Sequence, residues 1–243
     1  MFRGRSVAIV LPALDEEECV GSVVSEFRAQ PSVDRVLVVD NGSRDRTAER
    51  ARAAGAEVLP EPRRGYGAAL RAGLEHGLAS GAELLVLAES DGTFDAGEIE
   101  RLLAPLESHA LVLGSRRCCT ALPRYQRLGN RVVACLLAGL WPRTSARLTD
   151  VGCTYRALRA QAWRDLRPGV NAAGPEFSPE MICEAFALGL ATLEIPIACR
   201  RRAGGESKHT GSPAAALGTA LRMLRAIARK RITRRSGPGP THS

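Results

Sequence analysis

Short apolar segments alternate with amphipathic segments through the first half of the chain. The apolar segments have the length of strands and are apolar throughout, which predicts a mostly parallel sheet with helices on both faces. We expect strands over 6–14, 33–40, 56–61, 82–89 and 110–114. Apolar residues at helical spacing predict intervening helices over 16–29, 67–76 and 96–106. They predict one more helix between the second and third strands, with Ser43 or Asp45 as its N-terminal cap.

The alternation ends after Gly114. An arginine-rich loop over 116–127 leads to an amphipathic helix, the segment "DVGCTYRALR", a helix near 179–188 and "ATLEIPIACRRR". The chain closes with a basic amphipathic helix and a polar tail. We therefore predict one α/β domain over 1–212, a basic amphipathic helix over 213–235 and a disordered tail over 236–243.

The composition narrows the class of partner. The net charge of +8 comes almost wholly from arginine and fits either anionic partners or a coding bias. Aromatic residues make up only 4%, which disfavours nucleic-acid binding by base stacking. The longest uncharged apolar run, 132–141, is about half of the roughly 20 residues that a membrane span needs.

The seven cysteines are odd in number and show no CxxC spacing. Neither a zinc site nor the disulfide framework of a secreted domain fits this pattern. Acidic residues follow the short apolar N-terminal run, so we interpret that run as a first strand rather than a signal peptide. A reducing, cytoplasmic location fits these features best.

Three predicted strands end in carboxylates, within "PALDEE", "VVDNGSRD" and "LAESDGTFD". Because the carboxyl ends of parallel strands share one edge of a sheet, we expect these acids to converge there. Each alone is also explained as a turn or a helix cap. Glu89 and Asp91, two residues apart, suit a hard cation such as Mg²⁺ or Mn²⁺, whereas the alternative is that Asp91-Gly92 only makes a turn.

The order of these motifs, followed by "GSR", "DVGCTYR" and "EIPI…RRRAGGESK", resembles the family 2 glycosyltransferases of the GT-A fold. The resemblance is strongest to the dolichol-phosphate mannosyltransferase-like branch, which uses polyprenyl phosphates. It extends from about Val7 to Lys208. It implies an inverting, metal-dependent transfer of a hexose, mannose or glucose, from a sugar nucleotide to a polyprenyl phosphate.

The resemblance also implies a role for particular residues. The donor nucleotide and its metal are assigned to Pro12, Leu14, Glu16, Val38, Asp40, Glu89, Ser90 and Asp91, with Glu89 and Asp91 as metal ligands. The catalytic set is Asp91, Arg116, Arg202 and Lys208, whose cations surround the donor diphosphate and the acceptor phosphate. The acceptor is assigned to Arg116, Arg127 and Glu180, although Glu180 is equally explained as an acid at a helix N-terminus.

The chemistry explains these residue types. Negative charge grows on the departing nucleoside diphosphate, and a metal with fixed cations stabilises it. A phosphate acceptor has a second pKa near about 6 and is largely dianionic at neutral pH, so it needs no general base. Arginine is well suited to holding phosphate oxygens, although each arginine in isolation is also explained as solvated surface charge.

Several positions depart from the family pattern. Asp15 replaces a usual Asn, Leu14 a common aromatic residue and Glu89 a usual Asp. The segment "DGTF" is also atypical, so GDP-mannose, UDP-glucose and other sugar nucleotides all remain open as donors. Two alternatives are a glycosyltransferase for a soluble acceptor and a non-catalytic protein that binds sugar nucleotides.

The basic C-terminal helix has two interpretations. It carries an apolar stripe flanked by basic residues, which is typical of helices that lie on anionic membranes. The same pattern is also produced by a helix that packs on its own domain. The stripe comprises Leu217, Ala220, Leu221, Leu224, Ala228 and Ile232, and its flanks comprise Arg222, Arg225, Arg229, Lys230 and Arg231.

Overall fold

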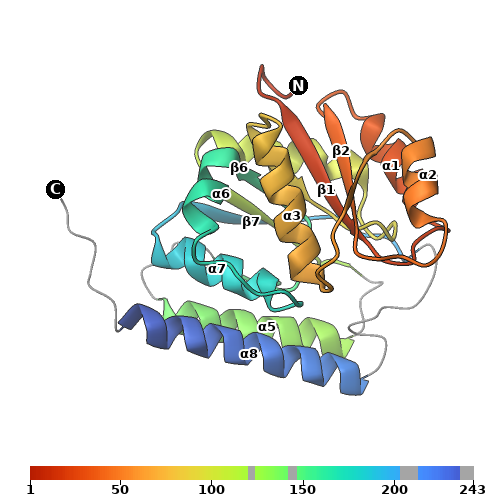
Figure 1. Cartoon of the computed structure of the whole chain (residues 1–243). Coiled ribbons are helices and arrows are strands. Elements are labelled where there is room, and N and C mark those ends of the chain that lie inside the picture. Colours follow the sequence, from red (N-terminus) through yellow and green to blue (C-terminus); the bar gives the residue numbers. More distant parts are fainter. Residues whose placement is uncertain (120–123, 142–146, 203–212, 236–243) are drawn as a thin grey trace.

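The computed structural model of the protein describes residues 1–119, 124–141, 147–202 and 213–235. Figure 1 shows a twisted central sheet with helices on both faces and a pair of long helices below it. The sheet has seven strands in the order β3-β2-β1-β4-β6-β5-β7. The strands are β1 Val7–Ala13, β2 Arg35–Asp40, β3 Glu57–Pro60, β4 Leu84–Leu87, β5 Leu111–Ser115, β6 Arg156–Arg159 and β7 Thr192–Pro196.

All strands but β6 run in the same direction. β1 pairs in parallel with β2 and β4, β2 with β3, and β5 with β7, whereas β6 pairs antiparallel with β4 and β5. The predicted mostly parallel α/β fold is thus confirmed. β6 and β7, which lie within "DVGCTYRALR" and "ATLEIPIACRRR", are the two strands of this sheet that the sequence analysis did not predict.

The helices differ in detail from the sequence prediction. α1 begins at Val20 rather than Glu16, because Asp15 has a left-handed backbone (φ 52°) and the next residues form a turn. The helix predicted over 96–106 is two short 3-10 turns around a five-residue α-helix. The helices are α1 Val20–Arg28, α2 Thr47–Ala53, α3 Tyr66–Ala79, η1 Ala96–Glu98, α4 Ile99–Leu103, η2 Ala104–Glu107, α5 Arg124–Leu140, α6 Ala160–Leu166, α7 Phe177–Ala187 and α8 Pro213–Arg235.

The sheet separates two apolar cores. Successive side chains of a strand point to opposite faces, so Ile9 and Val38 pack on the side of α1 and α4 while Val10 and Val39 pack on the side of α3. On that second side Gly73 of α3 lies directly against Val10 and Val39. The absence of a side chain at Gly73 lets α3 approach the sheet closely.

α5 and α8 lie side by side and form an outer layer on the α3 side of the sheet (Figure 1). α8 packs on α7 and α5, and its buried contact is Ile227, which joins the same core as Val133 and Leu137 of α5. Lys230 also points inward, where its Nζ lies 3.1 Å from Glu184 and 3.6 Å from Glu180.

The stripe predicted on α8 is therefore mostly not the packing face. Leu221, Ala228 and Ile232 are exposed, while Leu224 is partly buried against the core. Lys230 was predicted as one of the basic residues that flank the stripe, and it is instead partly buried beside Glu180 and Glu184. The side chain of Leu217 is outside the described residues.

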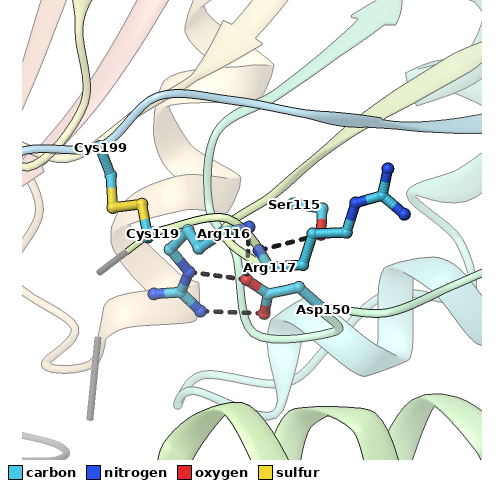
Figure 2. Close-up of a disulfide and its surroundings, with 6 residues drawn as sticks. All are labelled: Ser115, Arg116, Arg117, Cys119, Asp150 and Cys199. Carbon is cyan, nitrogen blue, oxygen red and sulfur yellow. Dashed lines mark hydrogen bonds and ion pairs between the residues drawn. A yellow bond between two sulfur atoms is a disulfide. The ribbon is translucent and has the colours of Figure 1, made fainter. Parts of the chain in front are cut away.

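One disulfide joins Cys119, after β5, to Cys199, after β7 (Figure 2). Their Cα atoms are 5.8 Å apart, within the usual range for a disulfide. The sequence analysis predicted no disulfide, so the Cys119–Cys199 pair is a feature that it missed. The bond ties two arginine-bearing segments together across 80 residues of sequence.

The close approach of α3 to the sheet can be tested with a matched pair of glycine-to-alanine substitutions. A Cβ at Gly73 would lie 2.2 Å from Val10 Cγ1, so Gly73→Ala should destabilise the protein by about 1–3 kcal/mol through overpacking. A Cβ at Gly129 of α5 would meet nothing within 4 Å, so Gly129→Ala should stabilise by about 0.5–1 kcal/mol. Urea unfolding measures both, and equal effects of the two substitutions would contradict this packing.

The disulfide predicts the number of reactive thiols. Of the seven cysteines, five are free, namely Cys19, Cys118, Cys135, Cys153 and Cys183. Denatured protein purified without reductant should therefore take up five maleimide labels by mass spectrometry, and seven after reduction. Seven labels before reduction would show that Cys119 and Cys199 are not joined under those conditions.

Candidate functional site

The acidic ends of β1, β2 and β4 meet at one edge of the sheet, as their neighbouring positions require. The Ser90 hydroxyl donates to the Pro12 carbonyl (2.8 Å), which fastens the segment after β4 to the end of β1. The Asn41 amide donates to Ala13 (2.9 Å), which joins the end of β2 to the same point. Carboxylates from three separate motifs are therefore held at one rim.

Arg202 bridges two of these carboxylates. Its Nη1 donates to Asp91 Oδ2 (3.0 Å) and its Nη2 donates to Glu16, while the Thr93 amide donates to Asp91 Oδ1 (2.9 Å). Asp91 is almost fully buried, so its charge requires partners of this kind. The sequence motifs at 16, 91 and 202 thus form one cluster.

The chain reaches this position along the segment after β7. Phe94 and Cys199 form an isolated antiparallel bridge, and the Arg200 amide donates to the Thr93 carbonyl (2.8 Å). The Arg200 guanidinium pairs with Glu26 and Asp95, at 2.9 and 3.1 Å. These contacts, with the disulfide, direct the segment so that Arg202 faces the rim.

Glu89 is held by a hydrogen bond from Thr154. The Thr154 hydroxyl donates to Glu89 Oε1 (2.7 Å) and is itself hydrogen-bonded to the Tyr66 hydroxyl, which must then be the donor because Thr154 has one proton to give. Burial, and then the nearby charge of Asp91, raise the pKa of Glu89 to about 7. Glu89 and Asp91 are thus close enough for their charges to interact, and two neighbouring carboxylates favour a cation.

Arg116 forms a two-point ion pair with Asp150, which Figure 2 shows beside the disulfide. Nε lies 2.8 Å from Oδ2 and Nη2 lies 3.0 Å from Oδ1, and Asn130 of α5 donates to the same carboxylate at 2.8 Å. Burial alone would raise the pKa of Asp150, but the Arg116 charge and its hydrogen bonds outweigh burial and lower that pKa.

The motif around Asp150 is fixed further by groups that the sequence analysis missed. Glu194 of β7 accepts from the amides of Thr149 (2.9 Å) and Asp150 (3.1 Å). The buried Arg156 guanidinium donates to the carbonyls of Cys153 and Val151, both at 2.8 Å. The available signal in the sequence was the arginine within "DVGCTYR". Once buried, an arginine must find several hydrogen-bond acceptors nearby.

The residues predicted for the nucleotide base surround the end of β2. Asp40 is half-buried and its Oδ1 accepts from the Ser43 amide (3.0 Å), which leaves its other oxygen for a ligand. Pro12 and Leu14 are also partly exposed along the rim. Val38, however, is fully buried in the core beside α1, and this burial argues against the predicted contact of its side chain with a nucleotide.

The turns beside this pocket explain two further sequence features. Neither Ser43 nor Asp45 is the N-cap of α2, which is Arg46; Asp45 precedes it, and Asp45 Oδ1 accepts from the amide of Thr47, the first helical residue (3.0 Å). Ser43 instead accepts from the amide of Asp15 (3.0 Å), and Asp15 Oδ1 accepts from the Arg44 amide (2.8 Å). Asp tolerates the left-handed backbone at position 15 almost as well as Asn does, so this departure from the family pattern keeps the turn.

The residues predicted for the acceptor are less closely gathered. Arg127 lies half-buried on α5. Glu180 of α7 accepts from the amides of Asn171 (2.8 Å) and Ala172 (2.6 Å) and lies near Lys230, contacts that suit a positioning role for the 171–172 loop. Lys208 lies outside the described residues. The acceptor assignments of Arg116, Arg127 and Glu180 and the catalytic assignment of Lys208 stay predictions.

Glu89 and Asp91 fit a hard divalent cation in residue type and placement. Both offer carboxylate oxygens at the rim, and Asp91 already binds a cationic group, the Arg202 guanidinium. Within the described ranges, no cluster of three His, Cys, Asp or Glu side chains is arranged to hold a metal alone. A magnesium or manganese ion here would therefore complete its coordination with donor phosphate oxygens and water.

The Arg116–Asp150 pair generates a stability prediction. Asp150→Asn leaves Arg116 without its buried counter-charge and should destabilise the protein by about 3–5 kcal/mol in urea unfolding. Because the pKa of Asp150 is lowered, its contribution is present above the ordinary value of 3.8 and is lost as pH falls through the lowered pKa. Glu49→Gln, which breaks the exposed Arg46 pair, is the control and should change stability little. Equal effects of the two variants would contradict the assignment.

The chain matches the family model described as Glycosyl transferase family 2 over residues 8–165. An uncharacterized glycosyltransferase of Mycobacterium tuberculosis is 38% identical over 214 residues, which are 86% of this chain and 92% of that protein. An undecaprenyl-phosphate mannosyltransferase of Micrococcus luteus is 31% identical over 217 residues, or 84% of this chain and 88% of that protein.

Among solved structures, the fold is similar to that of glucosyl-3-phosphoglycerate synthase from Mycobacterium tuberculosis in complex with Mn²⁺, UDP and glucosyl-3-phosphoglycerate. The TM-score is 0.71 at 26% identity, over 93% of this chain and 80% of that one. The family match, the relatives and the shared GT-A fold agree with the resemblance seen in the sequence motifs. The chain belongs to glycosyl transferase family 2 and is a glycosyltransferase.

Proposed function

We propose that the protein transfers a hexose from a sugar nucleotide to a polyprenyl phosphate. The observation that carries this proposal is the rim where Arg202 meets Glu16 and Asp91, with Glu89 and Arg116 nearby. Such a site suits two phosphate-bearing ligands and a divalent cation. The similarity to an undecaprenyl-phosphate mannosyltransferase supports a lipid phosphate as the acceptor.

Different residues would bind different parts of the sugar-nucleotide donor. Asp40, Pro12, Leu14 and Glu16 border the place for the nucleoside, while Glu89 and Asp91 would hold Mg²⁺ or Mn²⁺ beside the diphosphate. A bound divalent cation supplies positive charge that stabilises the leaving diphosphate. Arg202 would then exchange its contact with Asp91 for one with a phosphate oxygen.

The reaction needs only positioning and charge. An oxygen of the acceptor phosphate attacks the anomeric carbon, the bond from that carbon to the diphosphate oxygen breaks, and the nucleoside diphosphate leaves with its electron pair. The configuration at the anomeric carbon is inverted. Arg116, fixed by Asp150, offers the outer edge of its guanidinium to a phosphate without a loss of orientation.

A soluble acceptor that carries a phosphate is the second candidate. The observation that favours it is the fold shared with glucosyl-3-phosphoglycerate synthase, whose structure contains UDP and glucosyl-3-phosphoglycerate. No helix in the described part of the chain has the length and apolarity that a bilayer span requires. A lipid acceptor would then be met by peripheral contact with an anionic membrane.

The assay that tests the function uses purified full-length protein with Mn²⁺, GDP-mannose or UDP-glucose, and a short-chain polyprenyl phosphate. We expect release of the nucleoside diphosphate and formation of a polyprenyl-phosphate hexose, detected by mass spectrometry. Turnover with 3-phosphoglycerate but with no polyprenyl phosphate would support the second candidate. No turnover of any common donor by folded protein would contradict both.

Two substitutions test the carboxylates. Asp91→Asn removes a charge from the metal and phosphate site and should lower kcat by roughly 100-fold or more. Glu89→Asp restores the residue usual in the family and should retain or raise kcat. Both are compared with and without a chelator. A near wild-type rate for Asp91→Asn in the presence of chelator would show that the metal assignment is wrong.

A further inference from the structure

The exposed apolar side chains of the protein are concentrated on two helices. Among the described residues, seven large apolar side chains are exposed, and the two outside these helices are Met1 and Leu188. The other five lie on α5 and α8. They are Leu128 (64% exposed), Val132 (51%), Leu136 (46%), Leu221 (47%) and Ile232 (66%).

On α5 these side chains form a stripe opposite the packing face. Leu128, Val132 and Leu136 are four residues apart and therefore share one face of the helix. Ala134 and Leu137 on the other face are completely buried in the core. Packing within the chain is thus satisfied by one face of α5, and it does not account for the apolar residues of the other.

The exposed stripe of α8 lies in the same layer. α5 and α8 run side by side (Figure 1), Ile227 of α8 packs into the core that contains Leu137, and the Arg231 guanidinium lies 5.6 Å from the centre of the Trp141 ring. Both helices turn their buried faces to the body of the domain. Their exposed stripes therefore share the outer side of this layer, which we call the α5–α8 face.

The charge of the α5–α8 face is uniformly positive. Neither helix contains an aspartate or a glutamate over its whole length. Arg131 of α5 and Arg222, Arg225 and Arg229 of α8 are exposed beside the apolar stripes. Apolar residues flanked by arginines without acids match the surface of an anionic bilayer, where apolar groups enter the interface and cations meet lipid phosphates.

We propose that the α5–α8 face docks the protein on an anionic lipid membrane. This inference rests on the proposed function, because a polyprenyl phosphate keeps its chain in the bilayer. α5 provides most of the apolar contact, and it also reaches the site: Asn130, on its inner side, donates to Asp150, which holds Arg116. The phosphate-binding arginine therefore lies about one helix diameter, roughly 10 Å, from the membrane surface.

The test measures co-sedimentation of the full chain with vesicles of phosphatidylcholine and phosphatidylglycerol. We expect the wild type to pellet with these vesicles, less so as salt rises, and weakly with phosphatidylcholine alone. The triple variant Leu128→Gln/Val132→Gln/Leu136→Gln keeps charge and helix propensity and should bind at least about tenfold more weakly. Arg131→Gln/Arg225→Gln removes two of the four exposed arginines named above and should lose about half of the salt dependence.

Matched controls are Leu188→Gln, an exposed leucine on neither helix, and Arg52→Gln on α2, both of which should bind as the wild type does. Transfer to a short, water-soluble polyprenyl phosphate should be unchanged in the triple variant. Vesicle binding without any sugar transfer would support the surface while the proposed function fails. Equal pelleting of the triple variant and the wild type, or a dimer that the triple variant abolishes without any vesicle binding, would overturn the proposal.

Discussion

Carboxylates from three strand ends lie at one edge of the sheet and repel one another. The surrounding residues must compensate this repulsion with positive charge and hydrogen bonds. Arg202 neutralises Glu16 and Asp91 together, whereas the pKa of Glu89 is raised because Glu89 is partly buried and lies beside Asp91. A site arranged in this way has an unmet need for positive charge. Arg202 meets part of this need, and the proposed divalent cation would meet the rest.

The arginines at this edge are positioned by elements far from them in the sequence. Asp150 fixes Arg116, and Glu194 of β7 fixes the backbone at Asp150. The disulfide and the Arg200 ion pairs direct the segment that carries Arg202. Because each contact comes from a different element, the cations are preorganised by the fold rather than by local chain stiffness.

α5 connects this preorganised site to the outside of the molecule. Its inner side contributes Asn130 to the Arg116–Asp150 pair, and its outer side contributes apolar side chains to the α5–α8 face. One helix therefore contributes both to the Arg116–Asp150 pair and to the proposed membrane face.

The sequence by itself determined the parallel sheet, most strand positions and the convergence of acidic strand ends, because periodicity and strand-end residues are local properties. Only the tertiary structure decided that Arg116 pairs with Asp150, that Arg202 pairs with Glu16, 186 positions away, and that Val38 is buried. It also decided that Ile227 and Lys230 of α8 face inward. Both faces of α8 carry apolar and basic residues, so the buried face depends on the helices it meets, and no local pattern specifies them.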